Sequence, residues 1–328
     1  MLRTRASFAV MTLVAALAAA AQVQAVPWEK HMTEGNIFQN QSRHLEAEQA
    51  FLRALAEAEQ PAQVAAASNN LAAIHNYLGR YQEAERFARR AVGIWEKVHA
   101  KDHPDLAVAL NNLAGACYNQ GRNGEAERFF LRALNINIKT LGDGDPETAR
   151  VRKNLAEVYS ATRRYPEAER LYQQVRVARE TNAGPQSPQV AEVLNDIATL
   201  RHKQGRTAEA AALLERALAI WEKTVGPAHP SWALSAANLG SIHARLGRHS
   251  VAGQLFERAI PVLETALGPE HPDLGAILGE YARVLRNLHR KNEAKQAEAR
   301  SKAIFEKAVN ENTVARHTID VRDVRTAR

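Results

Sequence analysis

Residues 104–145 read PDLAVALNNLAGACYNQGRNGEAERFFLRALNINIKTLGDGD, and this stretch decides the fold. Leu106, Leu110, Leu113 and Cys117 recur at three- and four-residue spacing, which is typical of one buried face of a helix. Proline suits the first turn of a helix, where its missing N–H is no loss. A helix is therefore expected to begin at the proline that opens the stretch.

A second helix is expected in the same stretch. Residues 119–123 (NQGRN) end the first helix, because Gly121 supplies the positive φ that a tight C-terminal cap needs. The second helix is expected over residues 124–140. The residues expected to face inward are Ala126, Phe129, Phe130, Ala133, Leu134 and Ile138. The stretch is thus predicted to form a helix–turn–helix hairpin.

The hairpin pattern repeats every 42 residues along the chain. The recurring positions are Pro104, Pro146, Pro188, Pro230 and Pro272; Arg80, Arg122, Arg164, Arg206, Arg248 and Arg290; and Ala84, Ala126, Ala168, Ala210, Ala252 and Ala294. Glycine precedes the arginine at Gly79, Gly121, Gly205 and Gly247, whereas Arg163 and His289 replace it in the other two repeats. A fixed period of this length indicates a solenoid, in which each hairpin completes its core by stacking on its neighbours.

The repeated residues carry a family resemblance. Asn111-Asn112-Leu113-Ala114, Gly121-Arg122 and Glu125-Ala126-Glu127 resemble the long tetratricopeptide repeat of kinesin light chains and nephrocystin-type proteins. The resemblance implies an all-α fold, a right-handed α-solenoid of stacked hairpins whose first helices line the concave side. The coiled coil and kinesin-binding segment of true light chains have no counterpart in this sequence, so cargo transport is not implied.

The repeats divide the chain into expected segments. Residues 26–61 are expected to form an N-terminal capping hairpin, with helices over 28–39 and 45–55, and residues 313–328 a charged tail. The six repeats are expected at residues 62–103, 104–145, 146–187, 188–229, 230–271 and 272–312.

The first 25 residues are expected to be a cleavable signal peptide. Arg3 and Arg5 precede an acid-free apolar run from Ala6 to Ala21, and Val23-Gln24-Ala25 fits a small-x-small cleavage site. The run is shorter than the roughly 20 apolar residues of a spanning helix. The sequence therefore predicts an exported protein, periplasmic or secreted, with no stable membrane insertion after cleavage.

Composition excludes several classes of site. Cys117 is the only cysteine, so neither a disulfide framework nor a multi-cysteine metal site can form within the chain. No signature of a nucleotide-binding, hydrolase or metalloprotease site is found. His103, His229 and His271 share one position of the repeat and are interpreted as helix caps, and Cys117 as a buried small residue. A non-enzymatic protein with no cofactor and no metal is expected.

The resemblance also implies which residues face the concave groove. They lie one and two residues before a large apolar position: Asn69 and Asn70, Asn111 and Asn112, Lys153 and Asn154, Asn195 and Asp196, Ala237 and Asn238, and Gly279 and Glu280. An asparagine amide offers both a donor and an acceptor and can hold a peptide backbone. Whether the residues one before the apolar position bind a ligand or bridge neighbouring helices is open; for those two before, binding is favoured.

The sequence thus predicts a scaffold that binds an extended protein or peptide segment. The predicted groove residues are Asn69, Asn111, Asn112, Tyr118, Arg150, Lys153, Asn154, Asn195, His202, Lys203, Arg245 and Arg283. Basic residues outnumber acidic ones among the candidate groove positions, so an acidic peptide or a chain terminus is the favoured ligand. The alternative is binding of nucleic acid or another polyanion, suggested by the pI near 9.6; the signal segment argues against nucleic acid. The oligomeric state is left undetermined.

Overall fold

The computed structural model describes residues 27–41, 43–98 and 102–310, and within them the chain has fourteen helices and no strand. The expected signal peptide (1–25) and the tail (313–328) lie outside the described residues. None of the described helices combines the length and the apolar character needed to cross a lipid bilayer. The helices are α2 (Pro27–Asn40), α3 (His44–Ala56), α4 (Pro61–Tyr77), α5 (Tyr81–Val98), α6 (Pro104–Asn119), α7 (Asn123–Thr140), α8 (Pro146–Ala161), α9 (Tyr165–Ala183), α10 (Pro188–Lys203), α11 (Thr207–Thr224), α12 (Pro230–Arg245), α13 (His249–Leu267), α14 (Pro272–Asn287) and α15 (Lys291–Asn310).

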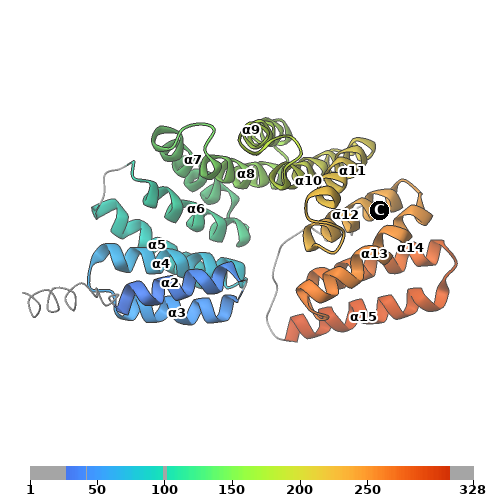
Figure 1. Cartoon of the computed structure of the whole chain (residues 1–328), viewed down its shortest axis with the longest axis horizontal. Helices are drawn as coiled ribbons and strands as arrows, with labels where there is room; N and C mark the ends of the chain where they lie inside the picture. The colour runs from blue at the N-terminus through green and yellow to red at the C-terminus, as the bar shows by residue number, and fades with distance from the viewer. Residues whose placement is uncertain (1–26, 42, 99–101, 311–328) are drawn as a thin grey trace, which may run out of the picture.

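The helices form consecutive hairpins that stack along an arch (Figure 1). Each even-numbered helix packs against the odd-numbered helix that follows it, and each odd-numbered helix packs against the next even-numbered one. In Figure 1, α7, α9 and α11 lie on the outer side of the arch, and α6, α8 and α10 lie toward its inner side. The all-α fold of stacked hairpins is therefore confirmed, and the two helices expected before Pro61 are present as α2 and α3.

The repeated prolines and histidines define the beginnings of the even-numbered helices. Each even-numbered helix from α4 to α14 begins with a proline. Before three of them, a histidine Nδ1 accepts a hydrogen bond of 3.2 Å from the backbone N–H two residues later: His103 before α6, His229 before α12 and His271 before α14. Asp145 does the same before α8, at 2.8 Å. The interpretation of these histidines as helix caps is confirmed.

The turn inside each hairpin requires a left-handed residue. Gly79, Gly121, Gly205 and Gly247 have φ between 74° and 79°. Arg163 and His289, which interrupt the glycine pattern, still adopt φ of 60°. The next residue closes the turn in each case; for example, the Arg164 N–H donates to the Tyr159 carbonyl at 2.8 Å. The tertiary structure thus imposes on these two residues a left-handed backbone conformation that glycine adopts without steric cost.

The inward face of the second helix differs in one respect from the expectation. Ala126, Phe130, Ala133 and Leu134 are buried as expected, whereas Ile138 is 38% exposed. The buried residues near the end of α7 are instead Ile136 and Asn137, each 3% exposed. The reason is geometric: at 100° per residue, Ile138 lies about 120° around the helix from Ala126, beyond the edge of the buried face.

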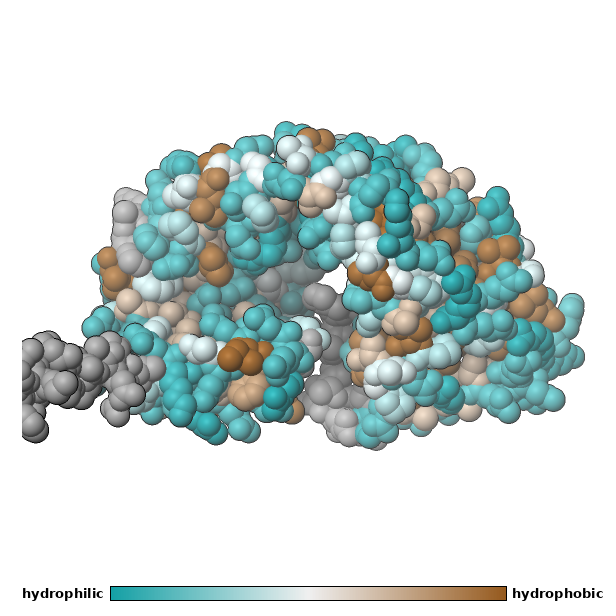
Figure 2. Space-filling model, viewed as in Figure 1, coloured by the Kyte–Doolittle hydropathy of each residue, from teal (hydrophilic) through white to brown (hydrophobic). Residues whose placement is uncertain are grey.

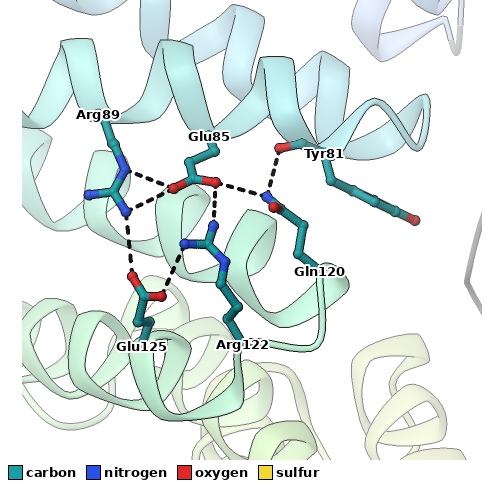
Figure 3. A network of polar contacts seen from close by, with 6 residues as sticks. All are labelled: Tyr81, Glu85, Arg89, Gln120, Arg122 and Glu125. Atoms are coloured by element: carbon teal, nitrogen blue, oxygen red, sulfur yellow. Dashed lines mark hydrogen bonds and ion pairs between the residues drawn. The ribbon is translucent and has the colours of Figure 1, made fainter.

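A recurring type of ion pair links several adjacent hairpins on the side of the turns, and Figure 3 shows the one between α5 and the α6–α7 turn. Glu85 of α5 accepts hydrogen bonds from Arg89 at 2.8 Å, from Gln120 at 3.0 Å and from Arg122. Arg122 also donates to Glu125 at 3.0 Å. The next repeat has the same arrangement, because Arg164 donates to Glu127 at 2.8 Å and to Glu167 at 2.9 Å. The recurring arginine therefore joins two adjacent hairpins at Arg80, Arg122, Arg164 and Arg290, whereas Arg206 pairs, within the described residues, only with Glu209 of its own hairpin.

The buried apolar residues form two clusters that meet at α10. Val193, Ile197 and Leu200 belong to the cluster that begins at Ala47, and Val190 and Leu194 belong to the one that ends at Ile304. The two faces of a single helix thus serve different halves of the arch. Alanines at the 42-residue positions from Ala84 to Ala294 are at most 2% exposed in both halves.

We expect Arg163→Gly and His289→Gly each to raise the free energy of unfolding by about 0.5–1 kcal/mol. The substitution removes the steric cost of a left-handed side chain, about 1–2 kcal/mol, and this gain is partly offset by the flexibility of glycine in the unfolded chain. Urea unfolding followed by circular dichroism measures the change. The reciprocal variant Gly121→Arg should be destabilised, and a loss of stability in both glycine variants would contradict the explanation.

We expect Glu85→Gln to lower the free energy of unfolding at pH 7 by about 1–3 kcal/mol, because two guanidinium groups lose their shared carboxylate. Burial alone would raise the pKa of Glu85, but the hydrogen bonds from Gln120, Arg89 and Arg122 outweigh it and hold the pKa below its ordinary value. The Glu85 carboxylate therefore stabilises the fold above its unfolded-state pKa, and this contribution is lost as the pH falls through the lower folded-state pKa.

The difference between wild type and Glu85→Gln should accordingly shrink as the pH is lowered from 7 to 3, which urea titrations at each pH will show. Glu83→Gln is the matched control, because Glu83 is exposed on the same helix and forms no ion pair with a described residue. A difference that stays constant over this range would show that the Glu85 charge does not contribute.

Candidate functional site on the concave face

The inner side of the arch is hollowed and its visible surface is mostly hydrophilic (Figure 2). The even-numbered helices contribute residues at three- and four-residue spacing that are partly or fully exposed. On α8 these are Glu147, Arg150, Asn154 and Glu157. Because corresponding helices repeat every 42 residues, these residues form rows that run along the concave face from one hairpin to the next.

The two asparagine rows are bonded to each other. Asn112 of α6 donates to the Asn69 Oδ1 of α4 at 2.8 Å, and Asn154 of α8 donates to the Asn111 Oδ1 of α6 at 2.9 Å. In both pairs the partners are 43 residues apart, so the second asparagine of one repeat meets the first asparagine of the preceding repeat. The amides therefore bridge neighbouring even-numbered helices.

This arrangement corrects one expectation about the groove. Asn111 is only 4% exposed and its amide oxygen is already bonded, so we remove it from the residues that touch a ligand. Asn69, Asn112 and Asn154 are partly exposed, and their amides retain further donor and acceptor capacity. Bridging and ligand binding are therefore compatible for these three residues, whereas Asn111 has a structural role.

The third bridge replaces the amides with charged groups. The Lys153 Nζ of α8 lies 3.8 Å from the Asp196 Oδ2 of α10 and 3.6 Å from the Glu157 Oε1. Although 24% of the Asp196 side chain is exposed, its Oδ2 is fully buried and accepts no hydrogen bond from a described residue. Burial raises the pKa of Asp196 to about 7 despite the opposing effect of Lys153, and Asp196 in turn raises the pKa of Lys153.

Beyond α10 the bridges change again. The Asn195 amide donates to the Ser235 Oγ of α12 at 2.8 Å and to the Ala191 carbonyl at 3.3 Å, so it bonds to a serine of α12 and not to Asn238. Ala237 offers no polar group, and Glu280 of α14 accepts a hydrogen bond from Ser241. The inner rows therefore follow one bonding scheme from α4 to α10 and another from α10 to α14.

Ion pairing leaves fewer unpaired cations on the concave face than the sequence suggests. Arg150 donates to Glu147 at 3.0 Å, and Arg283 donates to Glu280 at 3.1 Å. In the part of the chain that the structure describes, Lys203 and Arg245 have no ion-pair partner. These two residues occupy the same position at the ends of α10 and α12. Tyr118 and His202 are partly buried at the ends of α6 and α10.

The one cysteine is not exposed to solvent. Cys117 is 0% exposed in α6, and burial raises the pKa of its thiol. A buried thiol with a raised pKa is a poor nucleophile. This agrees with the interpretation of Cys117 as a small core residue.

The fold and the inner rows define a class of protein: an α-hairpin repeat protein with a polar concave face. Comparison with known sequences identifies the family. A family profile described as tetratricopeptide repeat matches residues 63–139, 105–181, 175–223, 189–265 and 231–307. Because these matches span most of the chain, the protein belongs to the tetratricopeptide repeat family. No curated protein matches the sequence.

Solved structures agree with this assignment. Nearly identical TPR-like repeats of a protein described as a Podospora anserina kinesin light chain share 26% identity, with a TM-score of 0.54 over 64% of this chain and 99% of that chain. BtubC from P. vanneervenii shares 24% identity, with a TM-score of 0.54 over 69% and 91% of the two chains. A Rap protein complexed with Competence and Sporulation Factor shares 15% identity, with a TM-score of 0.64 over 89% and 79%. The expected resemblance to kinesin light chain-type repeats is thereby confirmed.

Sequence reasoning did not identify the partners of the inner rows. The 43-residue offset between a donor amide and its acceptor is visible in the sequence only as two adjacent asparagines. The offset follows from the stacking of one hairpin on the next, which displaces corresponding residues by one position.

We expect Asn111→Ala to lower the free energy of unfolding by about 1–3 kcal/mol, because the Asn154 amide loses its acceptor. In a double-mutant cycle with Asn154→Ala, the two effects should be less than additive. Thermal and urea unfolding measure both. Asn135→Ala on the exposed surface of α7 is the control and should change stability by less than about 0.5 kcal/mol. If the losses of unfolding free energy from Asn111→Ala and Asn154→Ala simply add in the double variant, a direct bridge between the two residues is excluded.

Proposed function

We propose that this protein is an exported, non-enzymatic scaffold that binds an extended segment of a partner polypeptide along its concave face. Proteins of the tetratricopeptide repeat family commonly serve as scaffolds for protein–protein interaction. Export is proposed from the pattern of residues 1–25, which lie outside the described structure. Of the two exported locations, periplasm and extracellular space, the sequence favours neither.

The observation that carries the proposal is the polar row along the inner side of the arch. Asn69, Asn112 and Asn154 are partly exposed, and each amide has hydrogen-bonding capacity beyond its bridge. An extended peptide offers a regular series of N–H and C=O groups that such amides can bind without regard to its side chains. The remaining proposed contacts are Tyr118, Arg150, Lys153, Asn195, His202, Lys203, Arg245 and Arg283.

Charge suggests which end of the groove distinguishes one peptide from another. Lys153 and Arg150 are already paired with carboxylates of the groove, whereas Lys203 and Arg245 are unpaired within the described residues. A cation without a partner gains most from a ligand carboxylate, since no existing ion pair must be broken. We therefore propose that acidic side chains of the partner are recognised at the ends of α10 and α12.

The alternative function, binding of nucleic acid or another polyanion, is supported by the pI near 9.6. Binding of that kind needs a continuous basic stripe and stacking aromatic residues. In the described part of the concave face, carboxylates such as Glu147, Glu157 and Asp196 lie between the cations and weaken this alternative.

We expect the double variant Lys203→Glu, Arg245→Glu to bind acidic peptides at least tenfold more weakly than the wild type. The peptides are obtained by selecting a random phage-displayed library on the immobilised wild-type protein, and affinities are measured by fluorescence anisotropy. Reversing two unpaired cations removes two charge-assisted contacts and introduces repulsion.

Lys97→Glu with Lys223→Glu is the matched control, because both lysines are exposed near the ends of odd-numbered helices and form no ion pair with a described residue. Selected peptides without acidic enrichment, or equal binding by the two double variants, would refute recognition at α10 and α12. Stronger, salt-sensitive binding of a single-stranded oligonucleotide than of any selected peptide would favour the polyanion alternative.

A further inference from the structure

The repeat pattern is broken at two positions of the outer helices α9 and α11. The position held by Val92, Leu134, Leu218 and Ile260 in α5, α7, α11 and α13 is Arg176 in α9, and it is Lys302 in the terminal helix α15. The position held by Arg86, Arg128, Arg170 and Gln254 is Ala212 in α11. An apolar residue is thus replaced by a charged one, and a long side chain by a short one, in two helices that follow each other in the stack.

A cavity of about 390 Å³ lies where these two exceptions meet. Ala212 and Leu213 of α11 give it an accessible apolar lining above the buried Leu194 and Ile197 of α10, and Arg176, Arg201 and Arg216 surround it. Its volume falls within the range of ligand pockets, about 300–1,000 Å³. It also lies at α10, where the two buried apolar clusters meet. Six of its nine lining residues belong to α9 and α11, which lie on the outer side of the arch (Figure 1), and none of the nine is among the proposed groove residues.

The guanidinium groups around the cavity retain unused donors. Arg176 donates to Glu180 at 3.2 Å, and Arg216 donates to the same residue at 3.2 Å, so two cations share one carboxylate. Arg176 Nη2 and Arg216 Nη1 donate to no other described residue. The one carboxylate that lines the cavity, Glu209, is held by two hydrogen bonds of 2.6 Å from Arg206. The cavity therefore combines an apolar lining with guanidinium N–H groups that a ligand carboxylate can bind.

We propose that this cavity binds the C-terminal residue of a partner polypeptide, with an apolar side chain against Ala212 and Leu213 and the terminal carboxylate at Arg176 and Arg216. A C-terminal leucine carries both features, an apolar side chain and a carboxylate, within one residue. Bidentate binding of a carboxylate is the geometry that guanidinium groups favour.

The test compares acetyl-Gly-Gly-Leu, which has a free carboxylate, with its C-terminal amide, by isothermal titration calorimetry on the full chain. The free acid should bind at least tenfold more tightly than the amide. Arg176→Leu should reduce binding of the acid at least tenfold, because leucine occupies the corresponding position in α7 and α11, fills the cavity and removes the charge. For the same reason this variant should melt at or above the wild-type temperature, so that lost binding is not caused by unfolding.

Two further variants and one further ligand complete the test. Ala212→Arg restores the long side chain of the other repeats and should also block binding. Arg132→Leu, which removes the arginine of α7 that corresponds to Arg216, should leave binding unchanged.

Equal affinity for acid and amide, or unchanged binding by Arg176→Leu, would overturn the proposal. Octanoate binding as tightly as the peptide would overturn the assignment to a polypeptide C-terminus. The Lys203→Glu, Arg245→Glu variant should bind acetyl-Gly-Gly-Leu normally, so this site and the groove succeed or fail separately.

Discussion

The close packing of the two helices of each hairpin at a buried alanine is the constraint on which the rest of the structure depends. At α12 and α13 the space is so restricted that a Cβ added at Gly240 would lie 3.2 Å from the Phe256 ring and 3.4 Å from the Ala252 carbonyl oxygen. Helices that approach this closely leave apolar side chains on both flanks of the hairpin, which must be covered by the neighbouring hairpins. The arch follows from repeating this arrangement every 42 residues.

Polar contacts then determine how one hairpin sits on the next. On the side of the turns, Arg122 and Arg164 each bind a glutamate of the preceding hairpin and one of their own helix. On the concave side, amide pairs join α4 to α6 and α6 to α8, and Lys153 with Asp196 takes over between α8 and α10. The same rows thus combine a structural role with the capacity to bind a ligand. Lys203 and Arg245, at the ends of α10 and α12, have no ion-pair partner within the described residues.

Many local features could be predicted because they depend on a few neighbouring residues. The prolines and histidines before α6, α12 and α14 identify helix starts, because a cap bonds to a backbone N–H only two residues away. The turn at Arg163 was harder to predict, since its left-handed backbone is imposed by the hairpin and not by its own side chain. The exposure of Ile138 was missed because the centre of a buried face depends on the neighbouring hairpins.

The sequence by itself determined the all-α fold, the repeat length and the caps, since these follow from periodic spacing along one chain, and the family resemblance implied the residues of the inner rows. Only the tertiary structure decided which of those residues are available to a partner. Stacking brings Asn111 against Asn154 and buries it, pairs Arg150 and Lys153 with carboxylates, and leaves Lys203 and Arg245 without ion-pair partners within the described residues. Such pairings join residues that are far apart in the chain, and they depend on how far one hairpin is displaced on the next, which no local pattern encodes.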